Sequence, residues 1–246
     1  MRGALVVGGA NGIGLAIATL LAEDEQFERV YIVDRAEVSE EFRHPKFISK
    51  QFDLCSDDYS IFDTFTDIDT LIITAGFGRL AHFKDVEEQH IVESFNVNST
   101  AVIRILHHFF PRINSKEEFY CGVMGSIAGF ISSPLFAVYG ATKAALKIFI
   151  ESVNVELEMA GTPNRILNIS PGSIKGTAFY NGKNDLSVTR ELARDILSHL
   201  WAHDDLFIPQ YDEIFKTVLE RYHNDFRAEG RHSYEYKLQS GRVTKK

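Results

Sequence analysis

Short runs of apolar, β-branched residues alternate with longer stretches of helical periodicity along this 246-residue chain. This alternation predicts parallel strands joined by crossover helices, because neighbouring parallel strands need a connection of about a dozen residues or more. The predicted strands cover residues 4–8, 29–34, 46–53, 70–75, 118–126, 165–170 and 206–209. We expect an α/β fold with one doubly wound domain over residues 1–229, built on a mostly parallel sheet of about seven strands with helices on both faces.

The predicted helices cover residues 12–24, 85–108, 135–160, 187–202 and 212–227. The second helix should end before Pro111, because a proline inside a helix removes a backbone donor. Ser187 is expected to cap the fourth helix. For residues 230–246 we expect a polar, solvated tail, with a basic arm that contacts an acidic neighbouring subunit as the alternative.

Composition excludes several classes of protein. The chain has 26 Lys+Arg against 34 Asp+Glu, a formal charge of −8, which argues against a general nucleic-acid binder. Cys55 and Cys121 lie far apart and the histidines have no metal-ligand spacing, so we expect neither a disulfide framework nor a metal site. No run approaches the ~18 apolar residues of a membrane span. Cleavage of a signal peptide would destroy the glycine-rich loop described next, so we expect a cytoplasmic protein without membrane partners.

A glycine-rich loop, Gly8-Gly9-Ala10-Asn11-Gly12-Ile13-Gly14, follows the first predicted strand. Ligands of parallel sheets bind beyond the carboxyl ends of the strands, where this loop lies. Glycine permits a tight turn and lets a phosphate approach the backbone, and the following helix offers free N–H groups and its positive dipole end. A plain strand-to-helix turn is the alternative. The spacing favours a dinucleotide site that includes Gly8, Asn11, Gly12, Ile13 and Gly14.

Asp34 ends the second predicted strand, twenty positions after Gly14. A carboxylate at this distance can accept both ribose hydroxyls of an adenosine. Its charge would oppose a 2′-phosphate by about 1 to 4 kcal/mol, so we expect NAD as the cofactor. The adjacent Arg35 leaves NADP open, because its guanidinium could turn onto that phosphate.

Further cofactor contacts are expected after the third and fourth strands. Asp53-Leu54 ends the third strand, where the carboxylate could meet the adenine amino group or, equally, cap a following helix. Ala75 and Gly76 end the fourth strand and are small enough for the backbone to pass beside a cofactor.

Tyr139 and Lys143 are four residues apart in a predicted helix, so both side chains project from one face. The lysine ammonium is expected to lower the pKa of the phenol from about 10 and make the pair a proton donor and acceptor for an alcohol and its carbonyl. The spacing alone recurs by chance in many helices. Its weight comes from Ser126 at the end of the fifth strand, which could hydrogen-bond the substrate oxygen.

With these residues the sequence resembles the short-chain dehydrogenase/reductase family from its beginning to about Thr177. The resemblance implies a Rossmann fold with a nicotinamide cofactor on the three spaced glycines. It also implies that Ser126, Tyr139 and Lys143 form the catalytic trio, and that the tyrosine and the lysine contact the cofactor as well.

The resemblance places Asn98 on the family's fourth catalytic position, where it implies a water that links Lys143 to solvent. Asn96 is the competing candidate, but Ala101 fits the family spacing from Asn98. After the sixth strand, Pro171-Gly172 resembles the turn that faces the nicotinamide in this family. We expect Ile174 to contact the cofactor as well. A homodimer or homotetramer through the long helices is also implied.

Three departures from the family pattern affect the cofactor side and leave the four catalytic positions untouched. They are Val7 in place of a threonine, Ile73-Thr74 in place of an asparagine pair, and Gly176 in place of a threonine, with Thr177 one position late.

The expected function is an NAD(P)-dependent oxidoreductase that transfers hydride between the nicotinamide and a small alcohol or carbonyl substrate, with Tyr139 as general acid and base. A methyltransferase would have no use for the catalytic trio, whereas a catalytically slow dinucleotide sensor on the same fold stays open. Aromatic residues near the site suggest an apolar or ring-bearing substrate, with core positions as the equal alternative: Phe77, Phe130, Phe136, Phe179 and Tyr180. The polar connection 182–185 could form a small lid.

Overall fold

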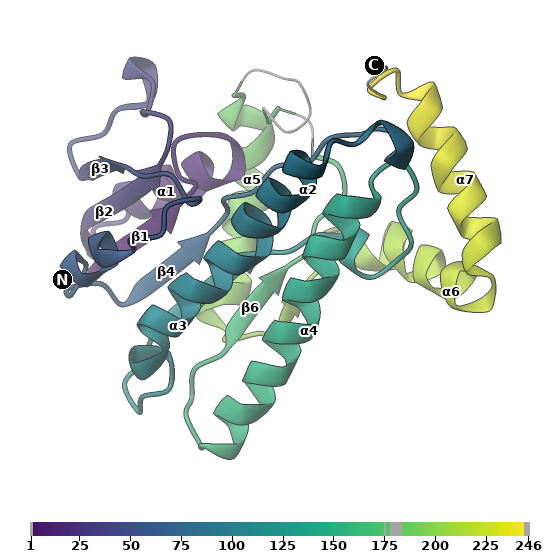
Figure 1. Ribbon diagram of the computed structural model, residues 1–246. Coiled ribbons are helices and arrows are strands. Elements are labelled where there is room, and N and C mark those ends of the chain that lie inside the picture. The colour runs from purple at the N-terminus through teal and green to yellow at the C-terminus, as the bar shows by residue number, and fades with distance from the viewer. Residues whose placement is uncertain (1, 175, 178–183, 244–246) are drawn as a thin grey trace.

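The computed structural model describes residues 2–174, 176–177 and 184–243, and its strands form one fully parallel sheet (Figure 1). The strand order is β3-β2-β1-β4-β5-β6-β7. The strands are β1 Arg2–Val7, β2 Phe27–Asp34, β3 Phe47–Gln51, β4 Thr70–Ile73, β5 Tyr120–Met124, β6 Ile166–Ile169 and β7 Leu206–Phe207. The expected single α/β domain with seven parallel strands is confirmed.

Helices cover both faces of this sheet, because alternate residues of each central strand are apolar on opposite sides. Val6 of β1 lies in a core shared with the helices α1 and α5, whereas the adjacent Leu5 lies in a core shared with α3 and α4. The α-helices of the sheet layers are α1 Gly12–Glu23, α2 Glu88–Phe95, α3 Ala101–Ile113, α4 Ala137–Met159 and α5 Leu186–Trp201. In the described part of the chain, none of the helices is long and apolar enough to cross a membrane.

The sheet order reverses between β1 and β4, which are neighbours although two strands separate them in the sequence. A ligand of an open α/β sheet binds in the crevice at such a reversal, beyond the carboxyl ends of the strands. The glycine loop follows β1 at this edge, and the segment after β4 begins beside it. The topology therefore places the glycine loop and the segment after β4 side by side at this edge.

The predicted helix over 85–108 is interrupted and extends further than expected. Between α2 and α3 the backbone forms one turn of π-helix at Asn96–Thr100, which we call a π-turn. Helix α3 then continues to Ile113 with Pro111 inside it. The expectation that the helix ends before Pro111 is wrong. The proline lies in the last turn, so the helix loses one hydrogen bond there and ends two residues later.

The C-terminal region also differs from expectation. A π-turn at Tyr211–Phe215 leads into α6 Lys216–Asn224, and α7 follows at Phe226–Gln239. Asp225 separates the two helices and caps α7, because its carboxylate accepts hydrogen bonds from the first-turn amides of that helix. Residues 230–239 of the predicted polar tail therefore belong to a helix, which the sequence analysis did not predict.

The cap of α5 is Asp185 rather than the predicted Ser187. The Asp185 carboxylate accepts from the Ser187 amide at 3.0 Å, and α5 begins at Leu186. A carboxylate accepts this amide more strongly than a hydroxyl would and complements the helix dipole.

Candidate active site

The glycine loop packs against the end of β4 so closely that two of its glycines exclude any side chain. A Cβ at Gly8, whose φ is +86°, would lie 2.4 Å from the Ala75 amide nitrogen. A Cβ at Gly14 would lie 2.3 Å from the Gly8 carbonyl oxygen and 2.4 Å from Thr74 Oγ1. Thr74 Oγ1 in turn donates to the Gly8 oxygen at 3.0 Å. Glycine is therefore required by space as well as by backbone conformation.

The N-terminus of α1 points its free amides out of this loop. Gly12, at φ +57°, donates its N–H to Oδ1 of Asn184 at 2.9 Å, and Asn184 Nδ2 donates to Asn11 Oδ1 at 2.9 Å. The half-buried Ile13 follows in the first turn. A polar acceptor thus already lies where a phosphate oxygen of a dinucleotide would bind, and the cradle fits a pyrophosphate. The role of Asn184 was not predicted, because it depends on a contact across 172 residues of sequence.

Asp34 lies at the end of β2 beside the same loop. Its Oδ2 accepts from the Ala10 amide at 3.1 Å and its Oδ1 from the Ala36 amide at 3.0 Å. The two hydrogen bonds fix the carboxylate and leave further lone pairs on both oxygens for ribose hydroxyls. Arg35 is exposed next to it.

Asp53 caps a turn rather than a helix. Its Oδ1 accepts from the Cys55 amide at 2.8 Å, and the next helical turn begins only at Ser60. The alternative of a helix cap is therefore wrong. Asp53 is exposed, whereas Leu54 is half-buried and packs against the α3 and α4 core.

The segment after β4 connects the cofactor loop to the predicted catalytic residues. Ala75 donates its amide to the Val7 carbonyl at 3.1 Å. A Cβ at Gly76 would lie 3.2 Å from Asn98 Oδ1 and 3.4 Å from Lys143 Nζ. Gly76 therefore lies beside the side chains of two predicted catalytic residues, Asn98 and Lys143.

Asn98 is fully buried in the π-turn between α2 and α3, whereas Asn96 is exposed. Its Oδ1 accepts from the Phe77 amide at 2.9 Å, and its Nδ2 donates to the Phe77 carbonyl at 2.8 Å and to Thr142 Oγ1 at 3.2 Å. A π-turn within a helical stretch redirects a side chain and is frequent at functional sites. Here it turns the amide of Asn98 toward the end of β4 and toward α4.

Lys143 and Tyr139 are both buried, on the first turns of α4. Lys143 Nζ donates to the Met124 carbonyl at 2.7 Å, and burial lowers its pKa to about 8. Burial raises the pKa of Tyr139 to about 12, while a hydrogen bond with Ser126 acts in the opposite direction. The expected lowering of the phenol pKa is wrong for this structure. The ammonium lies 5.7 Å from the phenol ring centre, and desolvation is the largest influence on Tyr139.

Ser126 lies where the ends of β5 and β6 meet. Its Oγ accepts from the Ala128 amide at 3.2 Å and donates to the Pro171 carbonyl at 3.5 Å, and the Ile127 amide donates to the same carbonyl at 3.1 Å. The predicted nicotinamide-facing turn is thereby tied to the predicted catalytic serine.

An aromatic residue that sequence reasoning missed covers this turn. A Cβ at Gly172 would lie 2.6 Å from Cζ of Phe215, which comes from the π-turn before α6.

The half-buried Ile174 accepts a hydrogen bond from Thr177 Oγ1 through its carbonyl at 3.0 Å. Thr177 contacts the cofactor loop as well, because a Cβ at Gly12 would lie 3.4 Å from its methyl group.

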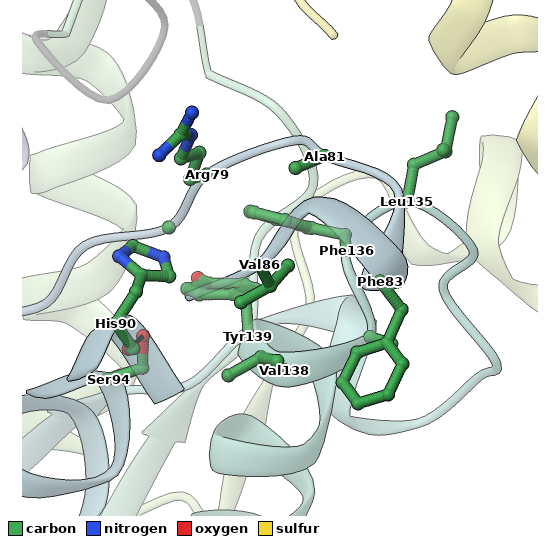
Figure 2. Close-up of a pocket in the computed structure, with 12 residues that line it drawn as sticks. Arg79, Ala81, Phe83, Val86, His90, Ser94, Leu135, Phe136, Val138 and Tyr139 are labelled. Atoms are coloured by element: carbon green, nitrogen blue, oxygen red, sulfur yellow. Dashed lines mark hydrogen bonds between the residues drawn. The ribbon is translucent and has the colours of Figure 1, made fainter. Parts of the chain in front are cut away.

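A small cavity opens beside Tyr139 (Figure 2). It has a volume of about 40 Å³ and lies between the segment after β4, α2 and the start of α4. Polar groups share its wall with apolar and aromatic ones: Gly78, Arg79, Ala81, Phe83, Val86, His90, Ser94, Leu135, Phe136, Ala137, Val138 and Tyr139. Figure 2 shows the rings of Phe136 and Tyr139 lying over one another at its centre, with His90 beside them.

Among the aromatic residues predicted to surround the substrate, Phe136 lines this cavity. Phe77 instead packs edge-on against His90, and the ring centre of Phe130 lies 5.2 Å from Lys147 Nζ. Phe179 and Tyr180 lie outside the described residues, as do positions 182 and 183 of the predicted lid. The remaining lid residues, Asn184 and Asp185, bond the α1 N-terminus and cap α5.

Comparisons with known proteins identify the family of this chain. The model of the short chain dehydrogenase family matches residues 2–186. An uncharacterized short-chain type dehydrogenase/reductase of Sinorhizobium fredii is 30% identical over 195 residues, which cover 78% of this chain and 77% of that protein.

Two solved structures share the fold. A short-chain dehydrogenase from Sphingobium yanoikuyae in complex with NADPH gives a TM-score of 0.72 at 20% identity, covering 92% of this chain and 96% of that one. An alcohol dehydrogenase from the archaeon Thermococcus sibiricus complexed with 5-hydroxy-NADP gives 0.71 at 20% identity, covering 85% and 95%. From the family match and the relative in Sinorhizobium fredii, we conclude that the chain belongs to the short-chain dehydrogenase/reductase family.

Proposed function

We propose that this protein is an NAD-dependent oxidoreductase that interconverts a small alcohol and its carbonyl, with Tyr139 as the proton donor and acceptor. The observation that carries the proposal is the convergence of four buried side chains at the carboxyl edge of the sheet: Asn98, Ser126, Tyr139 and Lys143. They come from three separate segments of the chain, and Asn98 and Lys143 lie beside Gly76 in the segment that packs on the glycine loop.

The cofactor residues fit a nicotinamide dinucleotide. Gly8 and Gly14 leave no room for a side chain, and the Gly12 amide already holds an oxygen acceptor, so the loop would hold a pyrophosphate. Asp34 would accept the ribose hydroxyls, and Asp53, Ala75 and the Pro171-Gly172 turn would complete the site. When bound, the nicotinamide supplies or takes up the hydride.

Asp34 favours NAD over NADP in this proposal. A 2′-phosphate would lie beside a fixed carboxylate, whose repulsion amounts to about 1 to 4 kcal/mol. The structural relatives with NADPH and 5-hydroxy-NADP keep NADP as the alternative. The exposed Arg35 is the residue that would make NADP acceptable.

Proton transfer follows from the hydrogen bonds around Tyr139. Ser126 Oγ and the Tyr139 hydroxyl would both donate to the substrate oxygen and stabilise the charge that develops there. With a pKa raised to about 12 by burial, the phenol carries its proton at neutral pH, so the site is set to donate a proton in carbonyl reduction. For alcohol oxidation the phenol must first lose that proton, and Lys143, with a pKa of about 8, can accept it only above about pH 8, where its amine is neutral. Asn98 would hold the water that links Lys143 to solvent.

The substrate is proposed to be a small molecule with an apolar or ring-bearing part, because Phe83 and Phe136 line the cavity beside Tyr139. We propose a cytoplasmic homodimer or homotetramer. Exposed apolar residues on α4 support an assembly through this helix, since Ile148, Val155 and Met159 are 58%, 58% and 82% exposed and recur at helical spacing.

The test is a Tyr139→Phe variant, which keeps the ring and removes the transferable proton. We expect kcat to fall by about 10² to 10⁴-fold, the usual contribution of a positioned acid or base, with the Kd for NADH within about twofold of the wild type. NADH and NADPH are titrated separately by fluorescence, and the preferred one is used with a panel of ketones and aldehydes. Wild-type turnover by the variant would overturn the assignment of Tyr139. NADH binding by the wild type without turnover of any substrate would favour the sensor.

A further inference from the structure

Helices α6 and α7 lie beyond residues 2–186, the part of the chain that the family model matches. In Figure 1, α7 stands at the side of the molecule next to the loops that precede α2 and α4. These loops contribute most of the wall of the cavity beside Tyr139. Helix α7 therefore lies against the outside of the loops that form the cavity wall.

One face of α7 makes these contacts. Gly230 lies against the segment before α4, since a Cβ there would be 3.4 Å from Ser132 Oγ and 3.7 Å from Pro134 Cγ. One turn further along, the Tyr234 ring meets the His82 ring edge-on, with centroids 6.1 Å apart. Residues 230, 234 and 237 recur at helical spacing, so they share one side of the helix.

Lys237 anchors this face by hydrogen bonds. Its Nζ donates to Ser133 Oγ at 2.6 Å and to the Pro134 carbonyl at 3.0 Å. Burial, with a smaller effect from Arg242, lowers the pKa of Lys237 to about 8. The ammonium is thus held in a partly buried position by two oxygen acceptors of the same short segment.

The segment that Lys237 holds leads directly to the catalytic tyrosine. Leu135 has a φ of +64°, a conformation that a leucine adopts only when surrounding contacts impose it. Its carbonyl accepts from the Ala81 amide at 2.9 Å, and the Phe136 amide donates to the Ser133 carbonyl at 3.0 Å. Phe136 then stacks on Tyr139.

The Glu229 side chain fixes α7 itself. It is 7% exposed and accepts from Arg221 Nε of α6 at 2.6 Å, so α6 and α7 form one clamped pair. Directly before α6, Phe215 lies against the Gly172 turn. The C-terminal region therefore contacts both the turn predicted to face the nicotinamide and the segment that carries Phe136.

We propose that Lys237 is a positioning residue for substrate binding. Through Ser133 and Pro134 it keeps Leu135 in its left-handed conformation and Phe136 against Tyr139. Helix α7 thereby sets the size of the substrate cavity without lining it, and loss of this anchor lets the Phe136 ring move and weakens the binding of a small carbonyl substrate. The kinetic part of this inference rests on the proposed oxidoreductase function.

The test compares Lys237→Met with Lys237→Arg in the full chain, and uses Lys216→Met on exposed α6 as the matched control. For Lys237→Met we expect KM for the carbonyl substrate to rise about fivefold or more with kcat within about twofold. This is the result for a lost interaction that stabilises the bound substrate and the transition state equally. The Kd for NADH should stay unchanged, Lys237→Arg should recover most of the loss, and Lys216→Met should match the wild type.

Hydrogen exchange gives a readout that does not depend on turnover. The Phe136 amide, bonded to Ser133, should exchange at least about fivefold faster in Lys237→Met, while the amides in the middle of α4 keep their protection. Equal exchange in the wild type and the variant overturns the inference, even for a protein that reduces no carbonyl. A lower melting temperature with unchanged KM and unchanged local exchange also overturns it, because the residue would then be structural only.

A second variant covers the case in which Lys237→Met fails to fold. Ser133→Ala removes one of the two acceptors and leaves α7 intact, so the same changes in KM and Phe136 exchange are expected at smaller size. A Ser133→Ala protein with wild-type KM and wild-type exchange contradicts the inference.

Discussion

The ring of Phe136 lies against the ring of Tyr139, with centroids 4.2 Å apart and ring planes inclined by 20°. The main chain at Gly78 closes over both rings, because a Cβ there would lie 2.5 Å from Phe136 Cζ and 2.8 Å from Tyr139 Cδ2. These residues help to enclose the cavity of about 40 Å³ beside Tyr139. The position of the Phe136 ring therefore sets the room available next to the proposed acid.

Gly78→Ala tests this contact. The added methyl group overlaps both rings and must displace Phe136, since its ring can rotate whereas Tyr139 is held by the buried α4 turn. We expect kcat/KM to fall about tenfold or more and the Kd for NADH to stay within about twofold, a difference of ~1.4 kcal/mol confined to the substrate side. Steady-state kinetics and fluorescence titration measure the two quantities.

A double-mutant cycle provides the control. In the background Phe136→Ala, the additional change Gly78→Ala should have a much smaller effect, because the ring that the methyl group displaces is gone. Equal effects of Gly78→Ala in both backgrounds would show that the loss arises elsewhere in the loop.

Lys143 should make the stability of the protein depend on pH. Its pKa is lowered from 10.5 to about 8 by burial, so between these values the unfolded chain binds more protons than the folded one. The free energy of unfolding should therefore rise with pH in this window, by up to about 1.4 kcal/mol per pH unit from this residue. Below pH 8 both states are protonated and the contribution is a constant penalty.

The measurement is urea unfolding of the wild type and Lys143→Met between pH 7.5 and 9. This window avoids the opposite contribution of Tyr139, whose raised pKa lowers stability only above pH 10. Lys237 contributes with the same sign in both proteins, so the difference between the two curves isolates Lys143. Parallel curves would mean that the Lys143 ammonium is not desolvated.

The cofactor preference should change when Asp34 loses its charge. Asp34→Asn removes the repulsion and keeps one of the two hydrogen bonds, with either the Ala10 or the Ala36 amide. We expect the Kd for NADPH to fall about tenfold relative to that for NADH, within the ~1 to 4 kcal/mol expected for this charge. Arg35→Ala is the companion variant, and it should weaken NADPH binding alone. A wild type that already prefers NADPH would contradict the proposed role of Asp34.

The sheet, and the proximity of the candidate site residues to one another, could be predicted because their signals are local. Buried parallel strands form continuous apolar runs, and the glycine loop combines a strand end, fixed spacing and a helix start. Ser126 and Tyr139 come together because one follows β5 and the other begins α4, which the strand and helix pattern already predicts. These features require no knowledge of distant contacts.

The features that were missed depend on tertiary contacts. The inner face of α7 is made of Gly230, Tyr234 and Lys237 rather than apolar residues, so the sequence resembles a solvated tail. The pKa of Tyr139 follows burial, which residue spacing cannot give. Phe215 reaches the turn at Gly172 across more than forty residues, and no periodic pattern indicates such a contact.

Asn184 should control the access of a dinucleotide to the α1 N-terminus. Its Oδ1 accepts the Gly12 N–H at 2.9 Å, the same donor that a pyrophosphate oxygen would use. In Asn184→Asp the carboxylate is stabilised there by the helix dipole and repels the pyrophosphate, so we expect the Kd for NADH to rise about tenfold or more, with a smaller effect at high salt. Asn184→Ala removes the acceptor without adding charge and should change the Kd by less than about fivefold, the worth of one neutral hydrogen bond. Fluorescence titration at two ionic strengths measures both variants. Wild-type affinity in Asn184→Asp would show that the pyrophosphate does not use the Gly12 amide.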